Sequence, residues 1–129
     1  MKAAFLIPII TLLFAFADAL VFRAKTDPQI VWGFNVFLEA SKMLYIALII
    51  ACIMLGRSWK QRYIIPLILL HFVAKSIPFN IVAGLEWNYI GVGVFDMMIR
   101  FVTMGSVWMW LIMQGICLTV AYYILKGKL

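Results

Sequence analysis

His71 and Lys75 are two ionisable residues in the middle of a strongly apolar stretch, LLHFVAKSIPFN. Their spacing of four residues places them on one face of a helix. An imidazole can relay protons or bind a metal, whereas an ammonium at the centre of a bilayer costs about 2.5–3.5 kcal/mol and needs a partner. We therefore expect Lys75 to meet a carboxylate on a neighbouring helix.

Glu39 and Lys42 are three residues apart in the preceding apolar stretch and share a helical face. At 1.5 Å per residue, Glu39 lies about 6 Å further from the cytoplasm than Lys75. The sequence predicts a Glu39–Lys75 pair, with Lys42 and Asp18 as neighbours. Such a pair can fix which helices adjoin or dock a subunit. Together with His71, these residues can also form a polar path for protons or a small ion.

Asp96 and Arg100, four residues apart, are expected to pair at the outer mouth of the bundle. His71 is the sole histidine, so one chain cannot supply bis-histidine haem, and a haem site requires two chains to share their His71 residues. Cys52 and Cys117 are not a CxxC pair and are interpreted as small hydrophobic residues. We predict no cofactor and no metal site.

The composition of the chain indicates that lipid surrounds it. Its 129 residues are 67% hydrophobic and 12% charged, and the mean hydropathy is +1.09. A soluble domain is about half apolar and about a quarter charged, and a chain this short cannot bury so much apolar surface. The sequence predicts an all-α polytopic membrane protein, since barrel strands would alternate in polarity rather than run continuously apolar.

Four apolar stretches are long enough to cross a bilayer as helices. A shorter segment before the fourth stretch is too apolar for an ordinary loop and too polar to cross, so we interpret it as interfacial or re-entrant. The prediction is a single transmembrane helical bundle over residues 1–129. Its helices cover residues 3–22, 34–55, 63–84 and 101–125, and its interfacial segment covers residues 85–100.

Basic residues set the orientation by the positive-inside rule. Three segments that four crossings place on one side contain six basic residues and no acidic ones: Lys2, Arg57, Lys60, Arg62, Lys126 and Lys128. Both termini are therefore expected in the cytoplasm, and the membrane is expected to be a bacterial inner membrane. Short juxtamembrane charges do not make a folded basic surface, so nucleic-acid binding is not expected.

The first twenty residues, MKAAFLIPIITLLFAFADAL, permit a second interpretation. A positive start, an apolar core and Ala17-Asp18-Ala19 resemble a signal peptide with a small-x-small cleavage site. Cleavage of residues 1–19 would leave three helices with the same orientation. We expect the helix to be retained.

The sequence contains no nucleophile–base pair, phosphate-binding loop or metal cluster, so we predict that the protein is not an enzyme. The leading hypothesis is an accessory or interaction subunit, or an immunity-type partner, of a membrane complex or pore. Its partners would be the bilayer and another membrane protein, or further copies of itself. The alternatives are a minimal proton- or ion-coupled transporter or channel, and the membrane anchor of a redox complex, in which His71 binds haem or the helices line a quinone pocket.

Overall fold

The computed structural model describes residues 2–90 and 94–127. Helices dominate these residues, as predicted, and the exception is a two-stranded hairpin. α1 (Lys2–Thr26) and α2 (Val36–Gly56) are continuous helices over the first two apolar stretches. Both extend close to their predicted ranges, and α1 continues four residues further because nothing before Thr26 stops it. Arg23 and Lys25 lie in its last turn, where cations interact favourably with the helix dipole.

The connection between α1 and α2 is a short β-hairpin. Strands β1 (Ile30–Val31) and β2 (Phe34–Asn35) pair antiparallel around Trp32 and Gly33. Both turn residues have positive φ, 54° and 81°, as a two-residue hairpin turn with the favoured twist requires. The side chain of Asn35 then begins α2, accepting from the amides of Phe37 and Leu38 at 3.1 and 3.3 Å.

The predicted helix 63–84 is two helices. The 3₁₀ turn η1 (Gln61–Tyr63) leads into α3 (Ile64–Ala74), and α4 (Ile77–Ala83) follows at an angle of 43°. Pro78 explains the break, because in a continuous helix its ring would collide with the carbonyl of Ala74. At the second position of α4 the missing N–H of Pro78 is harmless. Lys75 and Ser76 therefore lie at the bend.

The prediction is wrong about where the fourth long helix begins. Residues 101–103 belong to α5 (Val94–Thr103), and α6 (Val107–Leu125) is a separate helix. Met104 and Gly105 both have positive φ, 54° and 72°, which ends α5, and Ser106 caps α6. The expected interfacial segment 85–100 is thus partly helical, with α5 as its second half. Gly91 and Gly93, within that segment, lie outside the described residues.

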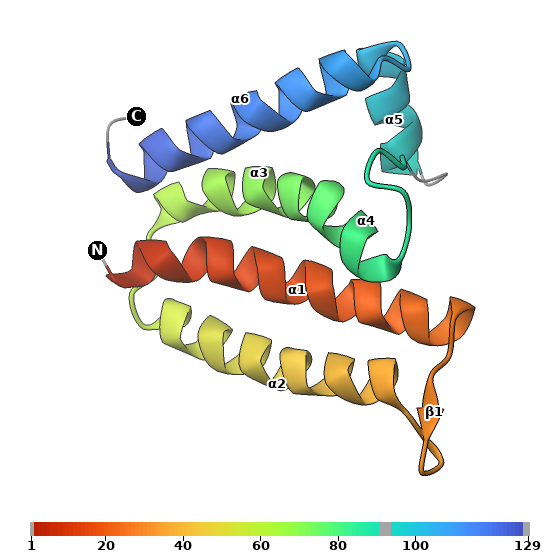
Figure 1. Ribbon diagram of the computed structural model, residues 1–129. Coiled ribbons are helices and arrows are strands. Elements are labelled where there is room, and N and C mark those ends of the chain that lie inside the picture. The colour runs from red at the N-terminus through yellow and green to blue at the C-terminus, as the bar shows by residue number, and fades with distance from the viewer. Residues whose placement is uncertain (1, 91–93, 128–129) are drawn as a thin grey trace.

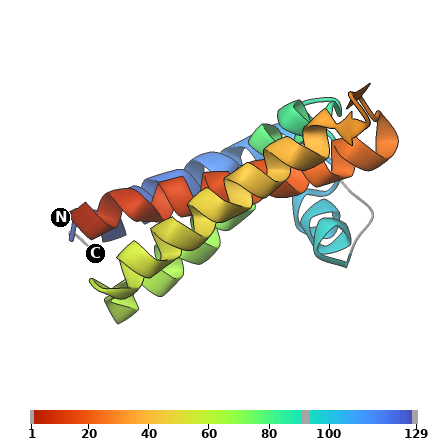
Figure 2. The same ribbon diagram turned by 90° about the horizontal axis from the view of Figure 1, so that it is seen from below.

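The long helices form one layer, in the spatial order α2, α1, α3 with α4, and α6 (Figures 1 and 2). α1 packs against α2 on one side and against α3 and α4 on the other, and α3 packs against α6. Ala15, Ala17 and Ala19 are completely buried, since small residues let helix backbones approach closely. α5 lies across the end of the layer that is remote from both termini (Figure 1).

Much of the apolar surface of these helices is uncovered. α2, for example, buries only Ser41, Ala51 and Leu55 among its residues. Three helices, Ala4–Thr26, Val36–Gly56 and Val107–Leu125, are long and apolar enough to cross a membrane, and the bent pair α3–α4 passes the same test when taken as one span. Exposed apolar surface on this scale is characteristic of helices surrounded by lipid.

Candidate functional site: a charge cluster and two adjoining cavities

An ion pair joins the central helix to the bend between α3 and α4. The Nζ of Lys75 donates to one carboxylate oxygen of Asp18, and the hydroxyl of Tyr45 donates to the other. These three residues come from α1, the C-terminal cap of α3, and α2. The side chains of Lys75 and Asp18 are 30% and 29% exposed, so the pair is mostly buried.

Two aromatic rings also lie close to the Lys75 ammonium. Its Nζ lies 5.0 Å from the ring centroid of Phe14 and 5.1 Å from that of Phe79. Each cation–π contact of this kind contributes about 0.5–2 kcal/mol, with the higher values where water is excluded. A carboxylate and two ring faces therefore stabilise an ammonium within the helical layer.

The predicted Glu39–Lys75 pair is wrong. Glu39 instead pairs with Lys42, with 3.0 Å between Oε1 and Nζ, and both side chains are about half exposed. Depth along a helix axis does not determine which helices touch, and α1 lies between α2 and the α3–α4 pair. Asp18 on that intervening helix is therefore the carboxylate that Lys75 meets, and Glu39 finds its partner one turn along its own helix.

Sequence reasoning named Asp18 only as a neighbour and did not name Tyr45 at all. The signal for Tyr45 was available, since a tyrosine hydroxyl within an apolar helix needs a hydrogen-bond partner. Arg23 was also missed. Its guanidinium donates to the carbonyl of Val82 at 3.4 Å and lies 4.6 Å from the centroid of Phe37, which ties the end of α1 to α4 and to the start of α2.

His71 lies one turn before Lys75, as expected, and packs against the same Phe14 ring at 5.4 Å between centroids. On α5, Asp96 is half-buried and Arg100 is exposed, and Arg100 donates to the carbonyl of Ile90. This bond holds the connecting loop against α5. The Asp96–Arg100 pair at the outer mouth stays a prediction, as does a haem shared through His71.

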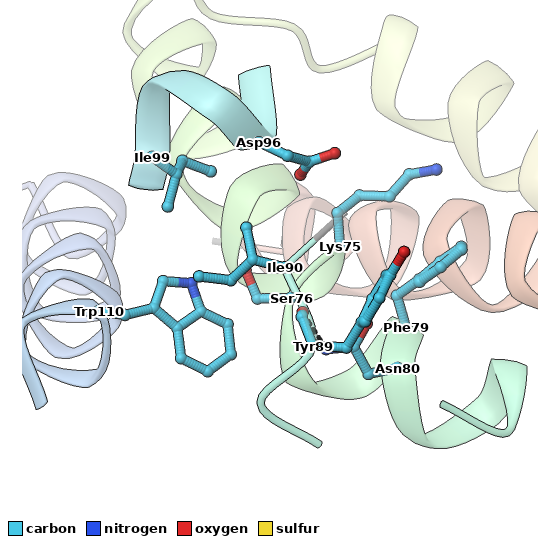
Figure 3. A pocket seen from close by; sticks show the side chains of 9 residues that line it. All are labelled: Lys75, Ser76, Phe79, Asn80, Tyr89, Ile90, Asp96, Ile99 and Trp110. Atoms are coloured by element: carbon cyan, nitrogen blue, oxygen red, sulfur yellow. Dashed lines mark hydrogen bonds between the residues drawn. The ribbon is translucent and has the colours of Figure 1, made fainter. Parts of the chain in front are cut away.

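Two cavities meet at the charge cluster. We call the smaller one the polar chamber; it has a volume of about 250 Å³, and its lining includes Asn80, Tyr89 and Trp110 (Figure 3). We call the larger one the apolar groove; it has a volume of about 980 Å³, and its lining includes Phe14 and Leu67. Four residues line both cavities: Lys75, Ser76, Asp96 and Ile99.

Asn80 shapes the polar chamber. It is 2% exposed, and its amide nitrogen donates to the carbonyls of Trp87 and Tyr89 at 3.0 and 2.8 Å. A single side chain thus holds the loop after α4 against that helix. This loop therefore forms an ordered wall of the polar chamber.

Metal ligands are not grouped in the described part of the chain, where no set of three or more His, Cys, Asp or Glu side chains could hold a metal ion. Cys52 and Cys117 are free thiols on α2 and α6.

Comparison with known proteins adds no assignment: no family model, curated protein or solved structure matches this chain. Any function must therefore be argued from the residues themselves.

Proposed function

We propose that the chain is a four-span protein of a bacterial inner membrane with both termini in the cytoplasm. The bent pair α3–α4 is then one broken span. Two features support this topology. The described N- and C-terminal ends lie at the same end of the layer (Figure 1). The basic loop between α2 and η1 and the end of α6, with Lys126, carry positive charge there, as expected of cytoplasmic segments.

We further propose that the protein is a non-enzymatic accessory or immunity-type subunit that binds another membrane protein. The observation that carries this proposal is that both carboxylate oxygens of Asp18 are engaged in contacts between helices. The Asp18 carboxylate is occupied by Lys75 and Tyr45, so groups from three helices act as a staple between them. A staple of this kind favours a scaffold over a proton path, in which a carboxylate must bind and release protons.

The outer face of α5 is the proposed docking surface. Its residues Met97, Met98, Phe101 and Val102 are 57–85% exposed, whereas Thr103 on the opposite face is buried. At ten residues, α5 is too short to cross a bilayer, which takes about 20. An apolar helix of a partner protein would cover this face by the packing that drives helix association in membranes.

The test is purification of the tagged protein in a mild detergent. We expect one membrane protein to co-purify at fixed stoichiometry, and Met98→Ser on α5 to reduce its recovery. Met43→Ser is the matched control, because Met43 is similarly exposed, at 69%, but lies on α2. Recovery that is equally affected by both variants, or purification of the chain alone, would overturn the proposal.

The rival transporter hypothesis has its own experiment. Vesicles that contain the purified protein and a pH-sensitive dye should leak protons no faster than empty vesicles, and Asp18→Asn should leave that rate unchanged. A proton flux that Asp18→Asn abolishes would replace the accessory function with transport.

A further inference from the structure

α2 forms one edge of the helical layer, and one of its faces is exposed. Its buried residues, Ser41, Ala51 and Leu55, lie on the side that packs against α1. Figure 2 views the layer from this edge and shows α2 in front of the other helices over most of its length. The opposite face of α2 is therefore accessible to lipid or to another protein.

A regular stripe of residues follows the exposed face. Intervals of three, four, three and four residues separate Glu39, Lys42, Ile46, Ile49 and Ile53. The two charged side chains are about half exposed, and the three isoleucines are 57–59% exposed. This alternation is the spacing of the seam along which two parallel helices pack in a coiled coil. We call these five residues the α2 stripe.

The charges of the α2 stripe do not suit a surface that faces only lipid. Ile46 is the middle residue of α2, and Lys42 lies about 6 Å from it along the helix axis. Charged residues at such a depth are costly, and in membrane proteins they usually face the interior of a bundle. Glu39 and Lys42 instead lie on the face of α2 that is directed away from α1. Their position therefore indicates a protein contact on this face.

Two copies of the α2 stripe are complementary in charge. Copies of one chain cross the membrane in the same direction, so two α2 helices meet in parallel, and a two-fold contact makes each interaction twice. Glu39 and Lys42 are about 4.5 Å apart along the axis, a distance that the long lysine side chain can span. Their bond of 3.0 Å within the chain leaves further donors on the ammonium and acceptors on the carboxylate.

The same contact removes lipid from all four charges. Each charge then has an opposite charge in its own chain and another in the second copy, and hydrogen bonds of this kind contribute to association between membrane helices. Ile46, Ile49 and Ile53 continue the contact toward the cytoplasmic end by side-chain packing. A different protein would need matching charges at the same depth, whereas a second copy has them by symmetry.

We propose that two copies of this chain associate in the membrane through their α2 stripes. Glu39 of each copy pairs with Lys42 of the other. The contact uses α2 and not α5, so the inference goes beyond the accessory function and does not depend on it. Such a dimer presents two α5 surfaces to partner proteins.

Oxidative cross-linking in isolated membranes tests the contact. In a background of Cys52→Ala and Cys117→Ala, we expect Ile46→Cys to give a disulfide-linked dimer. Ile116→Cys is the matched control, because Ile46 and Ile116 are the middle residues of α2 and α6 and are 57% and 58% exposed. Equal dimer yields from the two variants, or no dimer from Ile46→Cys, would overturn the proposal. So would a product of Ile46→Cys with the mass of a different protein.

Exchange of the charges tests the pairing separately. Copies with Glu39→Lys have two positive charges in the stripe, and copies with Lys42→Glu have two negative ones. Energy transfer between donor- and acceptor-labelled copies in vesicles measures association. We expect each variant alone to associate about tenfold more weakly than the native chain, because like charges then face one another. An equal mixture of the two variants should recover most of the lost energy transfer.

The mixture separates loss of the contact from loss of the fold, since misfolded copies would not regain association. Undiminished association of each variant alone would overturn the pairing, and so would a mixture that stays as weak as its components. Met98→Ser on α5 should leave energy transfer at the native value. A loss in that variant would place the contact on α5 and would overturn the assignment to α2.

Discussion

Asp18 and Lys75, 57 residues apart in the chain, form the ion pair that joins the central helix to the bend of the α3–α4 pair. Asp18 uses its second carboxylate oxygen to bind Tyr45 of α2. One acidic side chain therefore contacts groups from both neighbours of α1. This arrangement makes the relative placement of these helices depend on a few polar atoms within a mostly apolar molecule.

Replacing Asp18 should destabilise the fold more than replacing Glu39. We expect Asp18→Asn to lower the free energy of unfolding by about 1–3 kcal/mol, because the Lys75 ammonium loses its counter-charge. A fully buried pair would lose about 3–5 kcal/mol, but these side chains are 30% and 29% exposed. Glu39→Gln, in the more exposed pair with Lys42, should cost less than about 1 kcal/mol. Unfolding in mixed micelles measures the free energy of unfolding of both variants. Equal losses would contradict the proposal that Asp18 holds three helices together.

Removing both charges should restore much of the stability that one replacement loses. We expect Asp18→Leu with Lys75→Leu to unfold at a denaturant fraction closer to that of the native chain than either single variant does. The physical reason is that a stranded charge is costly, whereas an apolar pair of similar volume is not. A double variant as unstable as the sum of the single variants would show that the charges themselves are required.

Cysteine labelling tests the four-span topology. In a background of Cys52→Ala and Cys117→Ala, we expect Gln29→Cys to react with an impermeant maleimide on intact cells. Ser58→Cys and Gly127→Cys should react only after the membrane is opened. If α3 and α4 instead form a re-entrant pair, Gly127→Cys will react on intact cells, because α6 then crosses in the opposite direction.

Asn80 should control the order of the loop that follows α4. We expect Asn80→Leu to speed hydrogen exchange at residues 85–90, because the Trp87 and Tyr89 carbonyls lose their donor. The free energy of unfolding should fall by about 1–3 kcal/mol. Asn88→Leu makes the same chemical change within that loop and serves as the control. Exchange that is unchanged in Asn80→Leu, measured by mass spectrometry, would contradict this role.

The sequence was sufficient to predict the helical class and the approximate extent of α1 and α2, because apolar runs of spanning length have few alternatives in lipid. It was not sufficient to predict which helices touch. Glu39 and Asp18 both lie at depths that Lys75 can reach, and only the position of α1 between its neighbours decides between them.

The two helix breaks were more accessible to prediction than the helix contacts. Pro78 disfavours continuation of α3 by its ring and missing N–H, and Gly105 can adopt the positive φ that separates α5 from α6. Hydropathy averages over such residues, so both regions were predicted as uninterrupted helices. The polar chamber could not be predicted, because it depends on the loop that Asn80 holds.

The central position of α1 has a consequence for how the molecule is made. α1 is synthesised before the helices that pack on it, so its carboxylate is already in the bilayer when Lys75 leaves the insertion machinery. Insertion of Lys75 alone would be costly, and pairing with the Asp18 carboxylate reduces this cost. Removal of residues 1–19 would take Asp18 away with them, and the remaining helices would lose both their template and the partner that makes Lys75 acceptable to lipid.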